Sequence, residues 1–114
     1  MNGHDFLKET ATVIRTGWCS GADARDSAGK AVPVHDPAAR AWSLTAALAL
    51  VSERSGASLS SLSDALWGIS GVIPDWSLDA WNNAAGRSQT EALQMLDDAS
   101  SSLTRRPPPR AKLN

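Results

Sequence analysis

Apolar residues recur at spacings of three and four through the first half of the chain, which is the pattern of one face of an α-helix. The first run predicts a helix that Asp5 caps and that ends near Thr16, where Gly17 suits the left-handed residue that often closes a helix. The second run, 41–51, is apolar on nearly every side and follows Asp36, an N-cap with a proline after it. We expect this second helix to be the buried centre of the fold.

Three further helices are predicted in the second half of the chain. One opens at Ser58 or Ser61 and ends before Gly71, with leucines at helical spacing between these points. A short helix over roughly 78–85 follows Ser77, a good N-cap residue. The second half therefore reads as helices that are separated by short connections.

Local capping signals are clearest near the C-terminus. Trp76 and Trp81 stand at the two positions whose side chains pack as a hydrophobic staple at the start of the short helix. Ser88, with Glu91 three residues later, forms the capping box of the last helix, which must end before the proline triplet that starts at Pro107. Alanine and serine, with 19 and 15 residues, favour close contacts between the helices.

The stretch 17–36 carries no helical pattern, and so long a connection is uncommon in a small domain unless it has a role. Residues 26–29 are typical of a turn, and Val32 and Val34 around Pro33 suit a short strand at a sheet edge. The expected fold class is therefore all-α: a compact bundle of about five short helices, with a long loop after the first one that can hold a small β-hairpin.

Charge divides the chain into two parts. Residues 1–103 carry 7 Lys and Arg against 12 Asp and Glu, whereas residues 104–114 carry four basic residues and no acid. The three consecutive prolines impose extended polyproline II geometry on this second part. We expect a single helical domain over 1–103 and a basic, proline-rich, disordered tail over 104–114.

Composition narrows the class of protein. Only 21 residues are Leu, Ile, Val or Phe, but five tryptophans supply core area, and a net charge of −1 lacks the self-repulsion of disordered chains. No apolar run approaches the roughly 20 residues that cross a bilayer, and the first residues do not resemble a signal peptide. Cys19 has no partner for an intrachain disulfide, which fits a reducing compartment. We expect a cytoplasmic protein that is not attached to a membrane.

Several residues together resemble a family of small bacterial and phage proteins that is known only as a domain of unknown function. The resemblance covers roughly residues 5–103. The residues that carry it are Trp18, Ala24-Arg25-Asp26 with Gly29, Asp36-Pro37, Trp42, Trp81-Asn82-Asn83, Gly86-Arg87-Ser88, Glu91 and Leu96-Asp97. The resemblance implies a helical fold and no assigned activity.

Two positions depart from that family's pattern. Asn83 stands where the pattern has aspartate, and Ser88 stands where it has threonine, so a capping hydroxyl is kept. An acid–base role for position 83 has no carboxylate to carry it in this chain.

Catalytic and metal sites have little support in the sequence. Cys19 with His4 or His35 would make a nucleophile and a base, but their spacing gives no sign of such a pair. A lone cysteine beside Trp18 is more often a small buried hydrophobe. Two histidines and one cysteine in unrelated places do not supply the three or four ligands of a zinc site. We expect no catalytic residue, no metal and no cofactor.

The sharpest candidate for a binding site is a polar set of five residues. Two guanidinium groups, one carboxylate and two amides could line a pocket for a carboxylate, a phosphate or a peptide end. The same residues could instead serve the fold, as residues of turns, helix ends and a helix junction. The set comprises Arg25, Asp26, Asn82, Asn83 and Arg87. Trp67, just before Gly68, is a further candidate, as an exposed anchor for a partner.

These observations favour a small, non-enzymatic interaction or accessory protein that binds another protein, and the resemblance alone implies a phage or mobile-element origin. One alternative is a small enzyme or small-ligand-binding module that uses the polar set. Another is weak binding of nucleic acid through the basic tail, since a few cations can contact phosphates. The acidic body and the lack of interleaved aromatic and basic residues disfavour nucleic acid.

Overall fold

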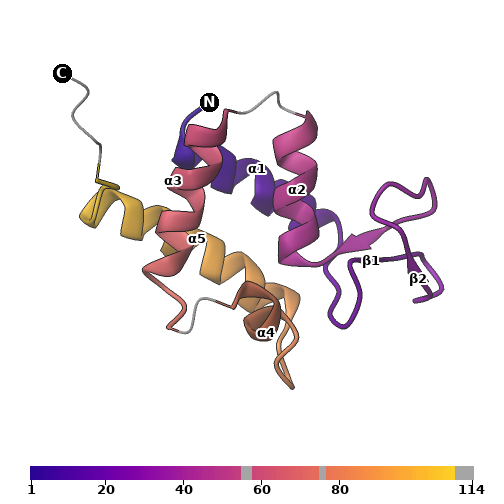
Figure 1. Cartoon of the computed structure of the whole chain (residues 1–114). Coiled ribbons are helices and arrows are strands. Elements are labelled where there is room, and N and C mark those ends of the chain that lie inside the picture. Colours follow the sequence, from indigo (N-terminus) through magenta and orange to yellow (C-terminus); the bar gives the residue numbers. More distant parts are fainter. Residues whose placement is uncertain (55–57, 75–76, 110–114) are drawn as a thin grey trace.

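Five helices and one small sheet build residues 1–54, 58–74 and 77–109, the part of the chain that the computed structural model describes (Figure 1). The helices are α1 (Gly3–Thr16), α2 (Leu44–Arg54), α3 (Leu59–Ser70), α4 (Leu78–Asn82) and α5 (Gln89–Arg105). The strands are β1 (Ala24–Arg25), β2 (Ala31–Val32) and β3 (Ala41–Trp42). The prediction of a mostly helical, compact chain is confirmed.

The core lies where α1, α3 and α5 pack against one another, and α2 covers another side of α1. The prediction that the second helix is the buried centre of the fold is therefore wrong, because one face of α2 is open. The sheet stands at the opposite end of the molecule from the N-terminus (Figure 1). Alanines at the contacts let the helices approach closely, because no long side chain separates them. The central buried side chains are Phe6, Leu7, Ile14, Leu44, Ala47, Ala65, Ile69, Ala92, Leu96 and Ala99.

A three-stranded antiparallel sheet corrects the all-α prediction. β1 is the central strand and pairs with β2 on one side and β3 on the other, so the predicted hairpin gains a third strand. The turn before β2 is the predicted one, because the Asp26 carboxylate accepts the backbone N–H groups of Ala28 and Lys30, each at 2.9 Å. β2 is an edge strand as expected, but it ends at Val32, before Pro33, so the prediction that the strand includes Val34 is wrong.

The helix predicted over 41–51 begins three residues late. Its first two residues form β3, and α2 starts at Leu44 because the Ser43 hydroxyl accepts the N–H of Ala46 at 3.1 Å and caps the helix. The Asp36 carboxylate accepts the N–H of Ala38 at 2.8 Å and closes a turn instead of opening a helix. The prediction that Asp36 is an N-cap of this helix is therefore wrong.

The first helix is capped differently from the prediction. The Asn2 side chain accepts the N–H of Asp5 at 2.8 Å, and the Asp5 carboxylate accepts the N–H of Asn2 at 3.3 Å, so Asp5 is the third residue of a capping box. Gly17 ends α1 with an extended φ of 178°, not in the left-handed region. A Cβ at Gly17 would collide with the carbonyl of Arg40, and this close approach is what requires glycine there.

Of the two starts predicted for the third helix, Ser58 is confirmed and Ser61 is wrong, because Ser61 lies inside α3; the predicted caps Ser77 and Ser88 are confirmed. Ser58, Ser77 and Ser88 are the N-caps of α3, α4 and α5, and each hydroxyl accepts a backbone N–H three residues later. Ser88 and Glu91 form the complete capping box. The serines thus mark the start of every helix after α2 in the described part of the chain.

The end of α4 and the start of the C-terminal segment refine two further predictions. α4 ends at Asn82, earlier than about residue 85, and Gly86 turns the chain toward α5 with a φ of +79°. α5 ends at Arg105, before Pro107 as expected. The predicted staple includes Trp76, which lies outside the described residues.

Candidate functional site

The side chain of Asn82 is the centre of a fully bonded polar cluster, and it is only 1% exposed. Its Oδ1 accepts the indole N–H of Trp18 at 2.8 Å and the backbone N–H of Leu44, the first residue of α2, at 3.1 Å. Its Nδ2 donates to the carbonyl of Cys19 at 3.1 Å and to Oδ1 of Asn83 at 3.0 Å. The amide thereby uses both donors and both acceptor positions, and it joins α4 to α2 and to the loop after α1.

Asn83 carries this cluster to the surface. Its Oδ1 also accepts the backbone N–H of Gly21 at 2.9 Å. A hollow of about 200 Å³ opens beside it, lined by Gly21, Ala22, Asp23, Ser43, Asp79 and Asn83. Among the described residues, two carboxylates and no cation line this hollow, so its charge is opposite to what a carboxylate or phosphate ligand would need.

Arg25 and Asp26 are bonded to the backbone around them. The Arg25 guanidinium donates to the carbonyl of Ser20, from Nε at 3.3 Å and from Nη2 at 3.1 Å, and from Nη1 to the carbonyl of Gly29 at 2.9 Å. The Asp26 carboxylate holds the turn before β2. Both side chains therefore shape the loops at the sheet.

Arg87 braces the junction between α4 and α5. Its Nε donates to the carbonyl of Trp81 at 2.8 Å, its Nη1 lies 3.2 Å from Oε2 of Glu91, and its guanidinium stacks 3.7 Å from the centre of the Trp81 ring. Among the described residues, no hydrogen bond or ion pair joins Arg87 to the other four members of the polar set. The structure thus joins Asn82 and Asn83 directly, and holds Arg25 and Arg87 elsewhere on backbone carbonyls.

Trp67 is half-buried and holds the start of the C-terminal segment. Its indole N–H donates to the carbonyl of Arg106 at 2.9 Å, and the Arg106 guanidinium lies 4.0 Å from the centre of the Trp67 ring. The same guanidinium donates to the carbonyl of Trp67 at 3.1 Å. The indole face and N–H that would anchor a partner are thus already used within the chain.

Cys19 is a buried thiol that donates to the carbonyl of Ala22 at 3.5 Å. Burial raises the pKa of the Cys19 thiol, the charge of Arg25 partly opposes this, and the charge of Asp23 adds to it. Neither histidine serves it as a base, since His4 bonds to Ser100 and His35 lies 3.1 Å from Glu53. The thiol therefore stays protonated at neutral pH and lacks the properties of a nucleophile.

We expect iodoacetamide to alkylate Cys19 at least about tenfold more slowly in the folded chain than in denaturant at pH 8.5, because only the thiolate reacts and the folded state disfavours it. Because the pKa of this thiol is higher in the folded chain, the thiol of the unfolded chain ionises first as the pH rises. The contribution of the thiol to the free energy of unfolding is therefore complete at neutral pH. It falls as the pH rises from about 8.5, the ordinary thiol pKa, through the higher pKa of the folded state. Mass spectrometry reports a single site, because the chain has one cysteine. Equal rates in the two states would show an accessible, ionised thiol instead.

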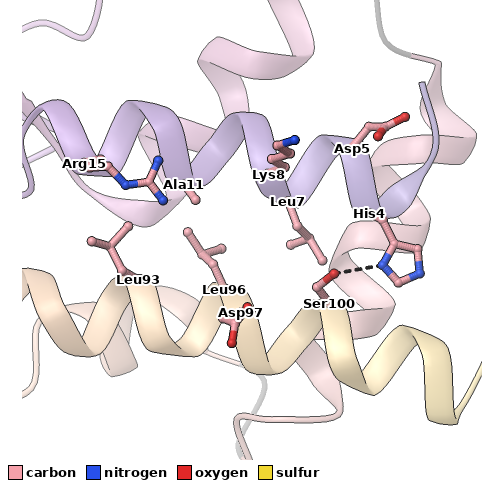
Figure 2. A pocket seen from close by; sticks show the side chains of 10 residues that line it. All are labelled: His4, Asp5, Leu7, Lys8, Ala11, Arg15, Leu93, Leu96, Asp97 and Ser100. Carbon is pink, nitrogen blue, oxygen red and sulfur yellow. Dashed lines mark hydrogen bonds between the residues drawn. The ribbon is translucent and has the colours of Figure 1, made fainter.

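One groove runs between α1 and α5 (Figure 2). Leu7 and Leu96 point into it, and at one end Oγ of Ser100 lies 2.8 Å from Nδ1 of His4. Serine beside histidine is the pairing of a nucleophile with a base. However, Ser100 lies inside α5, where the neighbouring backbone N–H groups are bonded within the helix and cannot stabilise an oxyanion. The rim mixes two acids with Lys8 and Arg15, and thus favours neither sign of ligand.

A second groove, of about 450 Å³, separates α2 from α3. α2 packs mainly on α1 and α4, whereas α3 packs mainly on α1 and α5, so the two helices do not fill the space between them. Leucines from three helices form the floor. The lining residues are Thr45, Leu48, Ala49, Ser52, Glu53, Leu62, Leu66 and Leu78. We call this the α2–α3 groove.

Comparison with known proteins places the chain in a family. A model described as a family of unknown function, DUF6197, matches residues 2–102. The chain belongs to this family. No curated protein matches this DUF6197 chain, and no solved structure matches it.

Metal-binding groups and membrane-spanning helices are both absent from the described part of the DUF6197 chain. Within residues 1–54, 58–74 and 77–109, no group of three or more His, Cys, Asp and Glu side chains is arranged to hold a metal ion. In the same ranges, no helix is long and apolar enough to cross a membrane.

Sequence reasoning missed the α2–α3 groove of this DUF6197 chain. The helical spacing of Leu62 and Leu66 indicates an apolar face, and the same pattern marks core leucines elsewhere in the chain. The signal in the sequence is Leu59, which continues the stripe by three residues into a serine-rich stretch, and the structure leaves this side chain 82% exposed. A leucine stripe that runs from the core to open solvent marks a face that the fold does not cover.

Proposed function

We propose that this chain is a small, non-enzymatic interaction protein that binds another protein through the α2–α3 groove. The observation that carries the proposal is the open, leucine-floored groove itself. An apolar surface of this kind is costly to leave in water and commonly marks a site of protein association. The exposed Leu59 extends the apolar surface beyond the groove along the same face of α3.

The polar set supports no competing proposal of a ligand site. Asn82 has no free hydrogen-bonding position, and the guanidinium groups of Arg25 and Arg87 are held by backbone carbonyls. A ligand at Asn82 would have to break these bonds before it gained its own, which makes binding there unfavourable. The bonds to carbonyls fix the guanidinium groups of Arg25 and Arg87 at different places, the loops at the sheet and the junction between α4 and α5.

We also propose that the protein works in the cytoplasm, as an accessory factor of phage or mobile-element origin. A cytoplasmic location is supported by the single cysteine, which is a buried free thiol. The origin is supported by the resemblance to small bacterial and phage proteins alone.

The proposal is tested by affinity capture from a lysate of the source cells with three baits. The first is the unchanged chain. The second is Ala49→Arg, which places a long cationic side chain at an exposed position in the groove, on a residue type that helices tolerate well. The third is Ser63→Arg, which makes the same charge change at an exposed position of α3 that does not line the groove.

We expect mass spectrometry to find proteins that the unchanged chain and Ser63→Arg capture equally and that Ala49→Arg captures at least about tenfold less, as for an interface hot spot. The free energy of unfolding of each variant should lie within about 0.5 kcal/mol of that of the unchanged chain, since both positions are exposed. Identical capture by all three baits would remove the α2–α3 groove from the function.

A further inference from the structure

The occupant of the α2–α3 groove can be specified further, and this step rests on the proposed function. We infer that the groove takes an amphipathic helix of a partner protein, with an apolar face of about two turns and a basic residue at each end of that face. Shape, length and charge each contribute to this assignment.

The shape of the groove is that of a helix-binding site. Thr45, Leu48, Ala49, Ser52 and Glu53 are spaced by three and one along α2 and form a continuous strip on one face of it. Leucines of α3 and α4 form the other side. Two walls made of helix faces suit a third helix packed between them, with anchors at spacings of three, four and seven residues. A peptide that binds by adding a strand would need a free strand edge, and no residue of the sheet is among the described residues that line this groove.

The length of the groove limits the apolar face of the occupant. From Thr45 to Glu53 the helix axis rises about 12 Å, at about 1.5 Å per residue. Two turns of a partner helix cover about 11 Å. Three apolar side chains at i, i+4 and i+7 therefore reach all of the leucine floor, and residues beyond them fall past the two ends.

One carboxylate, Glu53, lines the groove, and a second, Asp79, belongs to the neighbouring hollow and is bonded to Thr45 at the other end of the groove. Glu53 lines one end of the groove and is exposed, and its Oε2 lies 3.1 Å from Nε2 of His35. At the other end, Oδ1 of Asp79 accepts the hydroxyl of Thr45 at 2.6 Å, which holds this second exposed carboxylate beside the groove. No lysine or arginine is among the described lining residues. The arrangement is complementary to a helix whose apolar face is flanked by cations.

A second copy of this chain fits the groove less well. Residues 1–103 carry 12 acidic against 7 basic residues, and two copies joined face to face would bring their groove carboxylates together. Like charges at an interface oppose association. The negative electrostatic potential that repels a second copy attracts a basic partner.

The test uses a display library of a helix of about four turns, with leucines fixed at i, i+4 and i+7 and the flanking positions randomised. Clones are selected on the unchanged chain and counted as groove binders if Ala49→Arg abolishes their binding. We expect the groove binders to be enriched in Lys and Arg at both flanks. Their affinity should fall roughly threefold to tenfold on the double variant Glu53→Gln/Asp79→Asn, which removes both charges and keeps the side-chain shapes.

The matched control is Asp97→Asn/Asp98→Asn, which removes the same number of charges from exposed positions of α5 and should leave the affinity unchanged. Added salt should weaken binding to the unchanged chain and have little effect on binding to Glu53→Gln/Asp79→Asn.

Three outcomes would overturn the inference. Groove binders with neutral or acidic flanks would do so and would leave the proposed function intact. A library without any clone that depends on the groove would overturn both the inference and the proposed function. A dimer of the unchanged chain in sedimentation velocity that Ala49→Arg dissolves would assign the groove to a second copy instead.

Discussion

Replacing Asn82 with alanine is expected to lower the free energy of unfolding by about 3–5 kcal/mol. The change leaves the indole N–H of Trp18, the N–H of Leu44 and the carbonyl of Cys19 without the partner that Asn82 provides. It also opens a cavity at a position that is 1% exposed. Chemical denaturation measures the loss, and hydrogen exchange should show that the amide of Leu44 loses its protection.

Asn83→Ala is the matched control, because it removes the same side chain one residue later at an exposed position. It frees the N–H of Gly21 to water, so we expect a loss of about 0.5–1.5 kcal/mol. A loss below about 1 kcal/mol for Asn82→Ala would show that α2 and the loop after α1 do not depend on this amide.

The starts of α3, α4 and α5 were predictable, whereas the local caps of α1 and α2, at Asn2 and Ser43, were missed. The hydroxyls of Ser58, Ser77 and Ser88 each accept a backbone N–H three residues later, and such a signal is complete in the local sequence. The start of α2 was mistaken because β3 pairs with β1, a strand far back in the chain. An apolar run does not say whether such a long-range partner exists.

The polar set shows the same limit of local reasoning. The resemblance drew attention to Asn82, but its role depends on hydrogen bonds that span 64 residues to Trp18 and 38 residues to Leu44. A residue at the end of a short helix can close it, line a pocket or join distant segments, and only the tertiary contacts decide which. For Arg87, local reasoning came closer, since its partners Trp81 and Glu91 are six and four residues away.

The α2–α3 groove arises from how the other helices pack. α2 packs mainly against α1 and α4, and α3 packs mainly against α1 and α5, so the position of each helix is set mainly by other helices. The leucines on their facing sides are then left partly open. The other helices thus bury the core and leave one apolar strip uncovered. A binding site between helices can form in this way.

The close contact between α3 and α5 leads to the second large expected effect. Gly68 lies inside α3, where alanine normally stabilises a helix by about 1 kcal/mol relative to glycine. A Cβ at this position would lie 2.7 Å from the carbonyl oxygen of Ala99 and 2.9 Å from Cγ of Leu103, both on α5. The backbone of α5 cannot yield as the end of a flexible side chain would, so we expect Gly68→Ala to destabilise the chain by about 1–3 kcal/mol.

The control for this substitution is Ser63→Ala, at an exposed position of the same helix, which should stabilise the chain by a few tenths of a kcal/mol through helix propensity. Opposite signs for the two alanine variants in the same denaturation experiment would locate the tight contact at Gly68. A gain in stability for both would mean that α3 and α5 lie further apart than the close approach at Gly68 requires. In that case the contact at Gly68 would not fix the position of α3. It would then not set the width of the α2–α3 groove either.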